Sequence, residues 1–227
     1  MKKPFKLPKT GRKRFILAIG SLIGVGILAT SAAFTDNAYL NLGGAAGLGD
    51  ASPYSIALVD ASNKVVQAKP LAGNKAAAVN WPITNADKMV PGSTVSTAIT
   101  VFNNSKNADS TLKVTVGKLN GDGKVGTAPN ITQFLRFTAT AKIGAGADIP
   151  LFTNATAETA TANLGASNIL NARGIVAQQD GATYIPGGVP TSKAVVTLTI
   201  TYLDVPETVN YNGGQSGLQL IFDGTTT

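Results

Sequence analysis

The chain has 227 residues, of which 19 are basic and 12 acidic, and it contains neither histidine nor cysteine. The missing residue types exclude a Ser-His-Asp triad, a Cys-His pair and a conventional zinc site, because each needs imidazole or thiolate groups. Seven of the basic residues lie within residues 2–14, so the rest of the chain carries 12 basic and 12 acidic residues. This balance beyond the N-terminus gives no basic patch for nucleic acid.

The first 32 residues have the three-part layout of a secretory signal peptide. Residues 2–14 are basic, residues 15–29 are apolar, and small side chains follow. We expect a signal peptidase to cut between Ala32 and Ala33, which leaves residues 33–227 as a single domain. The alternative is a retained N-terminal anchor, although an apolar stretch of about fifteen residues is shorter than the roughly 20 of a stable span.

The new N-terminus, residues 33–47, reads as a short mobile strand followed by a joint. Apolar and polar residues alternate up to residue 42, and residues 43–47 are rich in glycine. Such a strand on a flexible joint is expected to add to a sheet edge of a neighbouring copy, or to pair within its own domain. The candidate anchors of this strand are the apolar residues Phe34, Ala38, Leu40 and Leu42.

Most of the remaining chain predicts short strands separated by Gly, Asn and Asp turns. The expected strands are 54–59, 64–68, 77–81, 94–103, 111–116, 134–143, 193–202 and 218–222. The pattern favours an all-β fold, a two-sheet antiparallel sandwich of the jelly-roll type. The clearest alternation lies in strands 94–103 and 111–116, and it predicts one pair of buried faces made by Val95, Ile99, Val101, Leu112, Val114 and Val116.

Two segments differ from this strand pattern. Residues 119–125 resemble part of a calcium loop, but only Asn120 and Asp122 stand at ligand positions and the closing Glu is missing, so a tight turn is expected. Residues 151–177 are rich in Ala, Thr and Asn. We expect them to form a partly helical insertion. The alternative is a long polar loop that extends from the sandwich.

Three stretches together resemble the TasA/camelysin family of exported proteins. The sequence TSAAFTD around the expected cleavage site resembles that of chains cut by SipW-type signal peptidases. The Pro91-Gly92 turn leading into TVSTAITVFNNSKNADSTLKVTV, and the closing VTLTITYLD and YNGGQSGLQLIFDG, are similar to strands of that family. The resemblance leaves residues 117–190 without a counterpart. The chain departs from the family pattern at Ser93, where an acid is usual, and it has far fewer charges.

The resemblance implies a jelly-roll protein secreted to the extracellular matrix or cell surface of a bacterium, by resemblance a Gram-positive one. Its expected partners are further copies of itself in a filament, the signal peptidase during export, and an accessory matrix or cell-wall component. Some family members are classed as metallopeptidases, but the absence of His and Cys makes us expect neither enzyme activity nor a cofactor. The alternative is a monomeric binding module for a cell-wall polymer or a host glycan.

Overall fold

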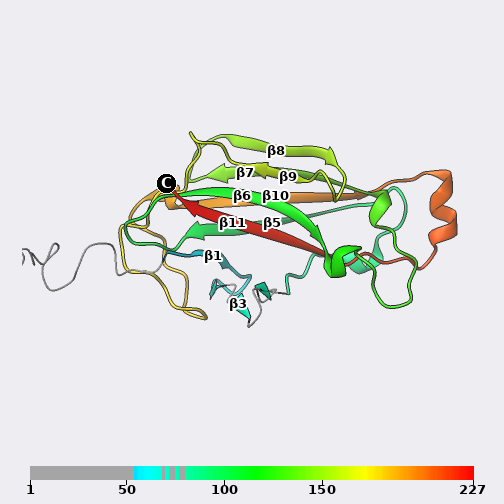
Figure 1. Ribbon diagram of the computed structural model, residues 1–227, viewed down its shortest axis with the longest axis horizontal. Coiled ribbons are helices and arrows are strands. Elements are labelled where there is room, and N and C mark those ends of the chain that lie inside the picture. The colour runs from blue at the N-terminus through cyan, green and yellow to red at the C-terminus, as the bar shows by residue number, and fades with distance from the viewer. Residues whose placement is uncertain (1–53, 68–69, 72–74, 77–79) are drawn as a thin grey trace, which may run out of the picture. The chain divides into compact units, whose positions relative to one another are not determined.

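The computed structural model of the protein describes residues 54–67, 70–71, 75–76 and 80–227. These residues form a mostly β structure with two antiparallel sheets and little helix (Figure 1). The large sheet has the order β2 (Val65–Val66), β1 (Ile56–Val59), β5 (Thr94–Asn103), β10 (Lys193–Tyr202), β7 (Leu135–Ile143) and β8 (Asp148–Ala155). The small sheet has the order β11 (Leu218–Thr226), β6 (Ser110–Lys118) and β9 (Thr161–Asn163).

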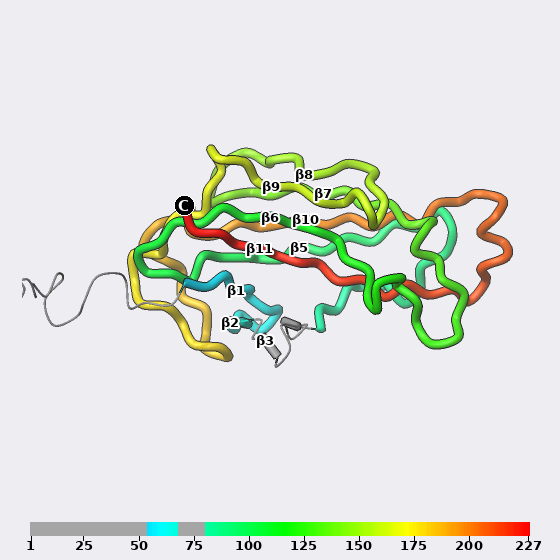
Figure 2. Tube along the Cα trace, viewed as in Figure 1, coloured from blue at the N-terminus to red at the C-terminus, as the bar shows by residue number. Residues whose placement is uncertain are grey.

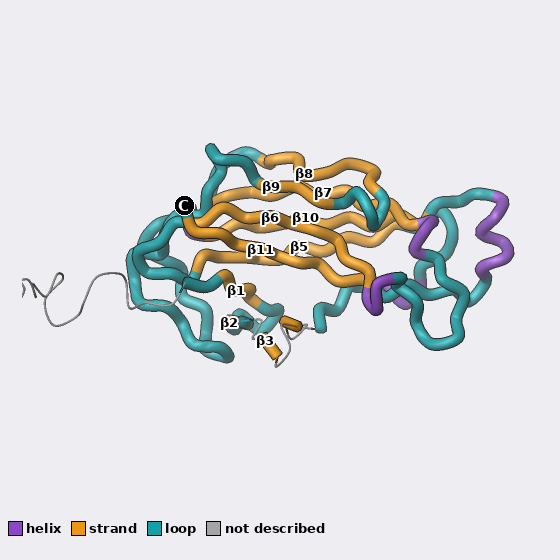
Figure 3. Tube along the Cα trace, viewed as in Figure 1, coloured by secondary structure: helices purple, strands orange, loops and turns teal. Residues whose placement is uncertain are grey.

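The remaining elements are short. Strands β3 (Pro70–Leu71) and β4 (Lys75–Ala76), each of two residues, form an antiparallel pair. The described 3-10 helices are η2 (Ala86–Lys88), η3 (Leu119–Gly121), η4 (Thr132–Phe134), η5 (Pro190–Ser192) and η6 (Pro206–Tyr211). Figure 3 shows strands through the middle of the sandwich and loops or helical turns at both ends of the strands.

The core lies between the two sheets and follows from the alternation of each long strand. In β10, every second residue from Ala194 to Tyr202 is buried, while the residues between them stay half-exposed. The same period of two makes one face of β5, β6 and β7 apolar and buried. The expected face pair is confirmed, because Val95, Ile99, Val101, Leu112, Val114 and Val116 are all buried.

Strands β5 and β6 follow one another in the chain but belong to different sheets. The chain crosses from the large sheet to the small sheet at a corner made of buried polar residues. The side-chain Nδ2 of Asn103 donates to the carbonyls of Ala108 and Leu170 at 2.7 and 3.1 Å, and its Oδ1 accepts the backbone N–H of Ser105 at 3.0 Å. These bonds tie the end of β5 to the corner that follows it and to the segment around Leu170.

Two expected turns are confirmed. The hairpin of β1 and β2 is closed by Asp60, whose Oδ1 accepts the backbone N–H groups of Ser62 and Lys64 at 2.9 and 2.7 Å. The calcium-loop-like segment is a tight turn around η3, in which Asp122 Oδ1 accepts the backbone N–H of Lys124 at 2.8 Å. The carboxylate of Asp122 therefore stabilises the turn in which it lies.

The expected helical insertion at residues 151–177 is wrong. The segment contains the end of β8, all of β9 and irregular backbone, without a helix. Its backbone hydrogen-bonds along β6: Leu164 N–H donates to the Leu112 carbonyl, and Leu170 and Ser110 exchange two bonds. Pairing with an existing strand satisfies this backbone, and the many Thr residues suit extended structure better than helix. Of the expected strand 77–81, residues 77–79 lie outside the described part, and Trp81 is in irregular backbone.

Candidate functional site

The candidate site begins with an open strand edge. Strand β11 pairs with β6 over its full nine residues, from Leu218 opposite Lys118 to Thr226 opposite Ser110. Among the described strands, none pairs with the other edge of β11, which is the last strand of the small sheet (Figure 1). An edge of this length presents a row of backbone N–H and C=O groups to any extended chain placed beside it.

The inner face of β11 is less well covered than that of its neighbour. Leu220 lies opposite Val116, and Phe222 lies opposite Val114, so all four side chains point toward the core. Val114 and Val116 are buried, whereas Leu220 and Phe222 remain half-exposed. On the inner face of the small sheet, the apolar side chains are therefore fully buried at β6 but only partly buried at the edge strand β11.

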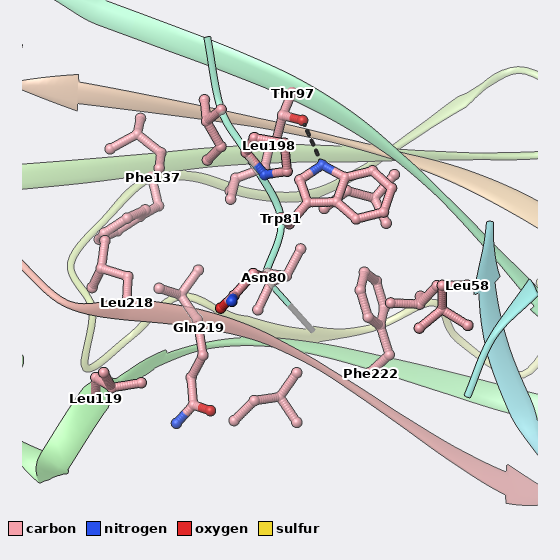
Figure 4. A pocket seen from close by; sticks show the side chains of 18 of the residues that line it. Leu58, Asn80, Trp81, Thr97, Leu119, Phe137, Leu198, Leu218, Gln219 and Phe222 are labelled. Carbon is pink, nitrogen blue, oxygen red and sulfur yellow. Dashed lines mark hydrogen bonds between the residues drawn. The ribbon is translucent and has the colours of Figure 1, made fainter. Parts of the chain in front are cut away.

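A groove of about 830 Å³ runs between this edge and the inner face of the large sheet. Figure 4 shows side chains from both sides of it, with Phe222 and Leu218 on β11 facing Leu58, Leu198 and Phe137, while the side chain of Gln219 points away from them. Most of the lining is aliphatic or aromatic: Ile56, Leu58, Val66, Trp81, Pro82, Ile83, Ile99, Val116, Leu119, Phe137, Leu198, Ile200, Leu218, Leu220, Ile221 and Phe222. Of the described residues that line the groove, Asp223 is the one ionisable group.

Strand β1 shows an unusual distribution of burial. Ala57 and Val59 are buried on the outer face of the large sheet, where they pack with Val65 and Phe102. The inward side chains Ile56 and Leu58 are only half-buried and line the groove. Within the described part of the chain, the inner face of the large sheet is thus only partly covered at β1, on the side that faces β11.

The two ends of the groove differ. Near its β1 end the sheets touch, since a side chain on Gly224 would meet Ile56 and the hydroxyl of Tyr54. That hydroxyl shares a hydrogen bond of 2.7 Å with Ser110 Oγ, and burial raises the pKa of Tyr54, so the phenol stays protonated at neutral pH. Further along, the indole N–H of Trp81 donates to Thr97 Oγ1 at 3.1 Å (Figure 4). Trp81 thereby stands over β5 as part of the groove wall.

This geometry fits an extended, mostly apolar peptide. Such a peptide would form backbone hydrogen bonds with β11 while its alternate side chains fill the space above Ile56, Leu58 and Ile99. A charged peptide would lose hydration without gaining partners among the aliphatic walls. In the described part of the chain, no group of three or more Asp and Glu residues is arranged to hold a metal ion, and no helix is long and apolar enough to span a membrane.

The residues singled out from the sequence and the groove lie in different parts of the chain. The cleavage residues Ala32 and Ala33, and the strand anchors Phe34, Ala38, Leu40 and Leu42, are outside the described residues. The groove itself was not predicted. The alternation of residues 218–222 indicated a strand, but no local signal shows that this strand is left at an edge.

The comparisons with known proteins give no further assignment. No family model matches the chain, and no curated protein matches it.

Proposed function

We propose that the protein is a secreted structural subunit of the TasA/camelysin type. Residues 33–42 of one copy add as a strand to β11 of the next copy, and the copies form a filament. The observation that supports this most is the unpaired edge of β11 beside an apolar groove. The same chain would then carry the open edge that accepts a strand and the short apolar strand that is donated.

The composition of the donated strand matches the groove. The positions of Phe34, Ala38, Leu40 and Leu42 differ by four, two and two, so in an extended strand these side chains share one face. Against β11 that face would cover the half-exposed Leu220 and Phe222. Each new backbone hydrogen bond contributes about 0.5–1.5 kcal/mol, and the buried apolar side chains add to this.

The added strand would also complete the fold. It would give the small sheet four strands, as expected for a jelly-roll-like sandwich. Each copy gives one strand and receives one, so the contact joins unlike surfaces, and where the rotation between copies does not close a ring the product is a filament. Until the signal peptide is removed, the donor strand stays tethered at the membrane, and assembly is thereby coupled to export.

We place the filament outside the cell, in the extracellular matrix or on the cell surface of a bacterium. The main partner is the protein itself, with a cell-wall or matrix component as an accessory partner. The proposal assigns no catalytic residue and no cofactor.

Electron microscopy of the purified protein beginning at Ala33 tests this proposal. We expect unbranched filaments that become more abundant as the protein concentration rises. A product that remains monomeric at all concentrations, by light scattering and by microscopy, would contradict the proposal.

The second candidate function is a monomeric binding module for a cell-wall polymer or a glycan. A second hollow of about 1020 Å³ lies among the loops at the end of the sandwich that carries η2 and η6. Trp81 and Tyr211 line it together with the polar Asn212, Gln215 and Ser216. Aromatic rings with neighbouring amides suit sugar binding. Binding of the monomer to purified cell-wall polymer, lost in Tyr211→Ala, would favour this function.

A further inference from the structure

The exposed apolar side chains gather at the two ends of the strands. The described residues contain six large hydrophobic side chains that are exposed: Val90, Leu119, Ile175, Val176, Ile185 and Val209. Three of them lie in the segment between β9 and β10, and the other three lie in turns that flank the opposite ends of β5, β6 and β10 (Figure 1). None lies within a strand. This distribution points to the ends, rather than the broad faces, as surfaces for contact.

The segment between β9 and β10 presents the largest of these clusters, which we call the loop patch: Ile175, Val176 and Ile185. Their side chains are 39%, 75% and 60% exposed. Gln178 joins the two halves of the loop, since its Oε1 accepts the Ile185 N–H at 3.0 Å. The Gln178 side chain therefore ties residue 185 to the first half of the loop, which carries Ile175 and Val176.

A buried polar base holds this loop in place. Arg173 is fully buried, and its guanidinium donates to Asn104 Oδ1 at 3.0 Å and to the Ile185 carbonyl at 2.6 Å. The same Asn104 Oδ1 accepts the Gln178 N–H at 2.8 Å, and the Arg173 guanidinium lies 5.4 Å from the centre of the Phe102 ring. A loop fixed in this way presents its apolar tips without a further loss of entropy on binding.

The loop patch lies beside the point where the described chain begins. The Ser105 carbonyl accepts the Arg173 N–H at 2.9 Å, and Ser105 Oγ accepts the Ser55 N–H at 3.2 Å. Figure 2 shows the loop, yellow to orange, at the end of the strands where β1 starts. Ser55, near the first described residue, therefore lies beside the base of this loop.

We propose that the loop patch docks against the next copy of the chain in the filament. The inference rests on the proposed strand donation. Eleven residues, 43–53, connect the donor strand to Tyr54, and fully extended they reach at most about 36–40 Å. An accepting copy that lies against this end of the donating copy is therefore within reach of the donor strand. Contact there would remove Val176 and Ile185 from water, and it would add to the affinity of the strand itself.

The surface that receives the loop patch is the opposite end of the accepting copy, where Val90 and Val209 are 61% and 79% exposed. The contact is head to tail, as the strand donation requires. Because both clusters are apolar, their pairing needs no charge complementarity, which agrees with the even charge balance beyond the N-terminus.

The test compares the assembly of the double variant Val176→Asp, Ile185→Asp with that of the unchanged protein, both starting at Ala33. The protein concentration at which filaments first sediment is expected to rise by about tenfold or more, because two carboxylates would be trapped in an apolar contact. The single Val176→Ser, which removes apolar surface without adding charge, is expected to raise it by about threefold. Ala98→Asp, at an exposed position on the outer face of β5, is the control and is expected to leave it unchanged.

A second measurement separates this inference from the strand donation. The same charged variant is made in a chain that begins at residue 43, and its binding of a synthetic peptide of residues 33–42 is expected to equal that of the parent. Filaments of the double variant at the unchanged concentration would overturn the loop contact and leave the strand donation intact. Absence of filaments from the unchanged protein would overturn both. A lowered Tm of the variant monomer would show that its own chain covers the patch, which also overturns the inference.

Discussion

Removal of residues 33–42 is expected to abolish filaments while leaving a folded monomer. The deletion takes away the proposed donor strand and none of the described strands. The groove beside β11 would stay open, and the core faces of β5, β6, β7 and β10 would keep their partners. Circular dichroism should report the β structure, and sedimentation velocity should report a single monomeric species.

Two other outcomes of this deletion carry information. An unfolded product would show that the strand pairs within its own domain. Filaments as abundant as those of the complete protein would contradict strand donation.

Substitution of Phe137 by Ala is expected to lower the free energy of unfolding by about 3–5 kcal/mol. Phe137 is fully buried on β7, where it lies opposite Ile200 and packs in the core cluster that contains Leu135 and Leu198. Its removal would leave a cavity between the two sheets in addition to the lost burial. Urea denaturation of the monomeric form, observed by the fluorescence of Trp81, measures the change.

Thr140→Ala is the matched control for this substitution. Thr140 lies three residues further along β7, and its side chain points to the half-exposed outer face. Substitutions at such sites usually change the free energy of unfolding by less than about 0.5 kcal/mol. A loss below about 1 kcal/mol for Phe137→Ala would show that the two sheets do not pack around this ring.

The long strands could be predicted from the sequence because their signal is local. Residues 94–103 and 193–202 place most of their large apolar side chains at every second position, and the structure forms β5 and β10 with those same bounds. A strand with one buried face needs this period of two. The turn at Asp60 was equally accessible, because its carboxylate caps backbone groups two and four residues away.

The segment 151–177 could not be predicted in the same way. Its Ala and Thr residues fit several conformations, and its buried residues, such as Leu164 and Leu170, have no regular spacing. What fixes it is the edge of β6, more than forty residues earlier, with which Leu164 and Leu170 form backbone hydrogen bonds. A partner that distant leaves no local pattern.

The groove and the loop patch were inaccessible for the same reason. The number of strands that pair with β11 depends on the order of strands in the sheet. The residues of β11 carry no signal of that order. Arg173 would be expected at the surface, yet its burial follows from Asn104 and Phe102, which come from the end of β5 and the corner after it. Such contacts join residues about seventy positions apart.

The most direct test of strand donation uses the absence of cysteine from the chain, because introduced thiols then react alone. Asn41→Cys marks the polar face of the donor strand, and Gln219→Cys marks β11 at the groove. Neighbouring strands lie about 4.8 Å apart, within reach of a short bifunctional thiol reagent. The two single variants are mixed, assembled and treated with this reagent. We expect a covalent dimer that contains one copy of each variant. No such dimer from the mixture, together with a cross-link inside single copies of the double variant, would contradict the account.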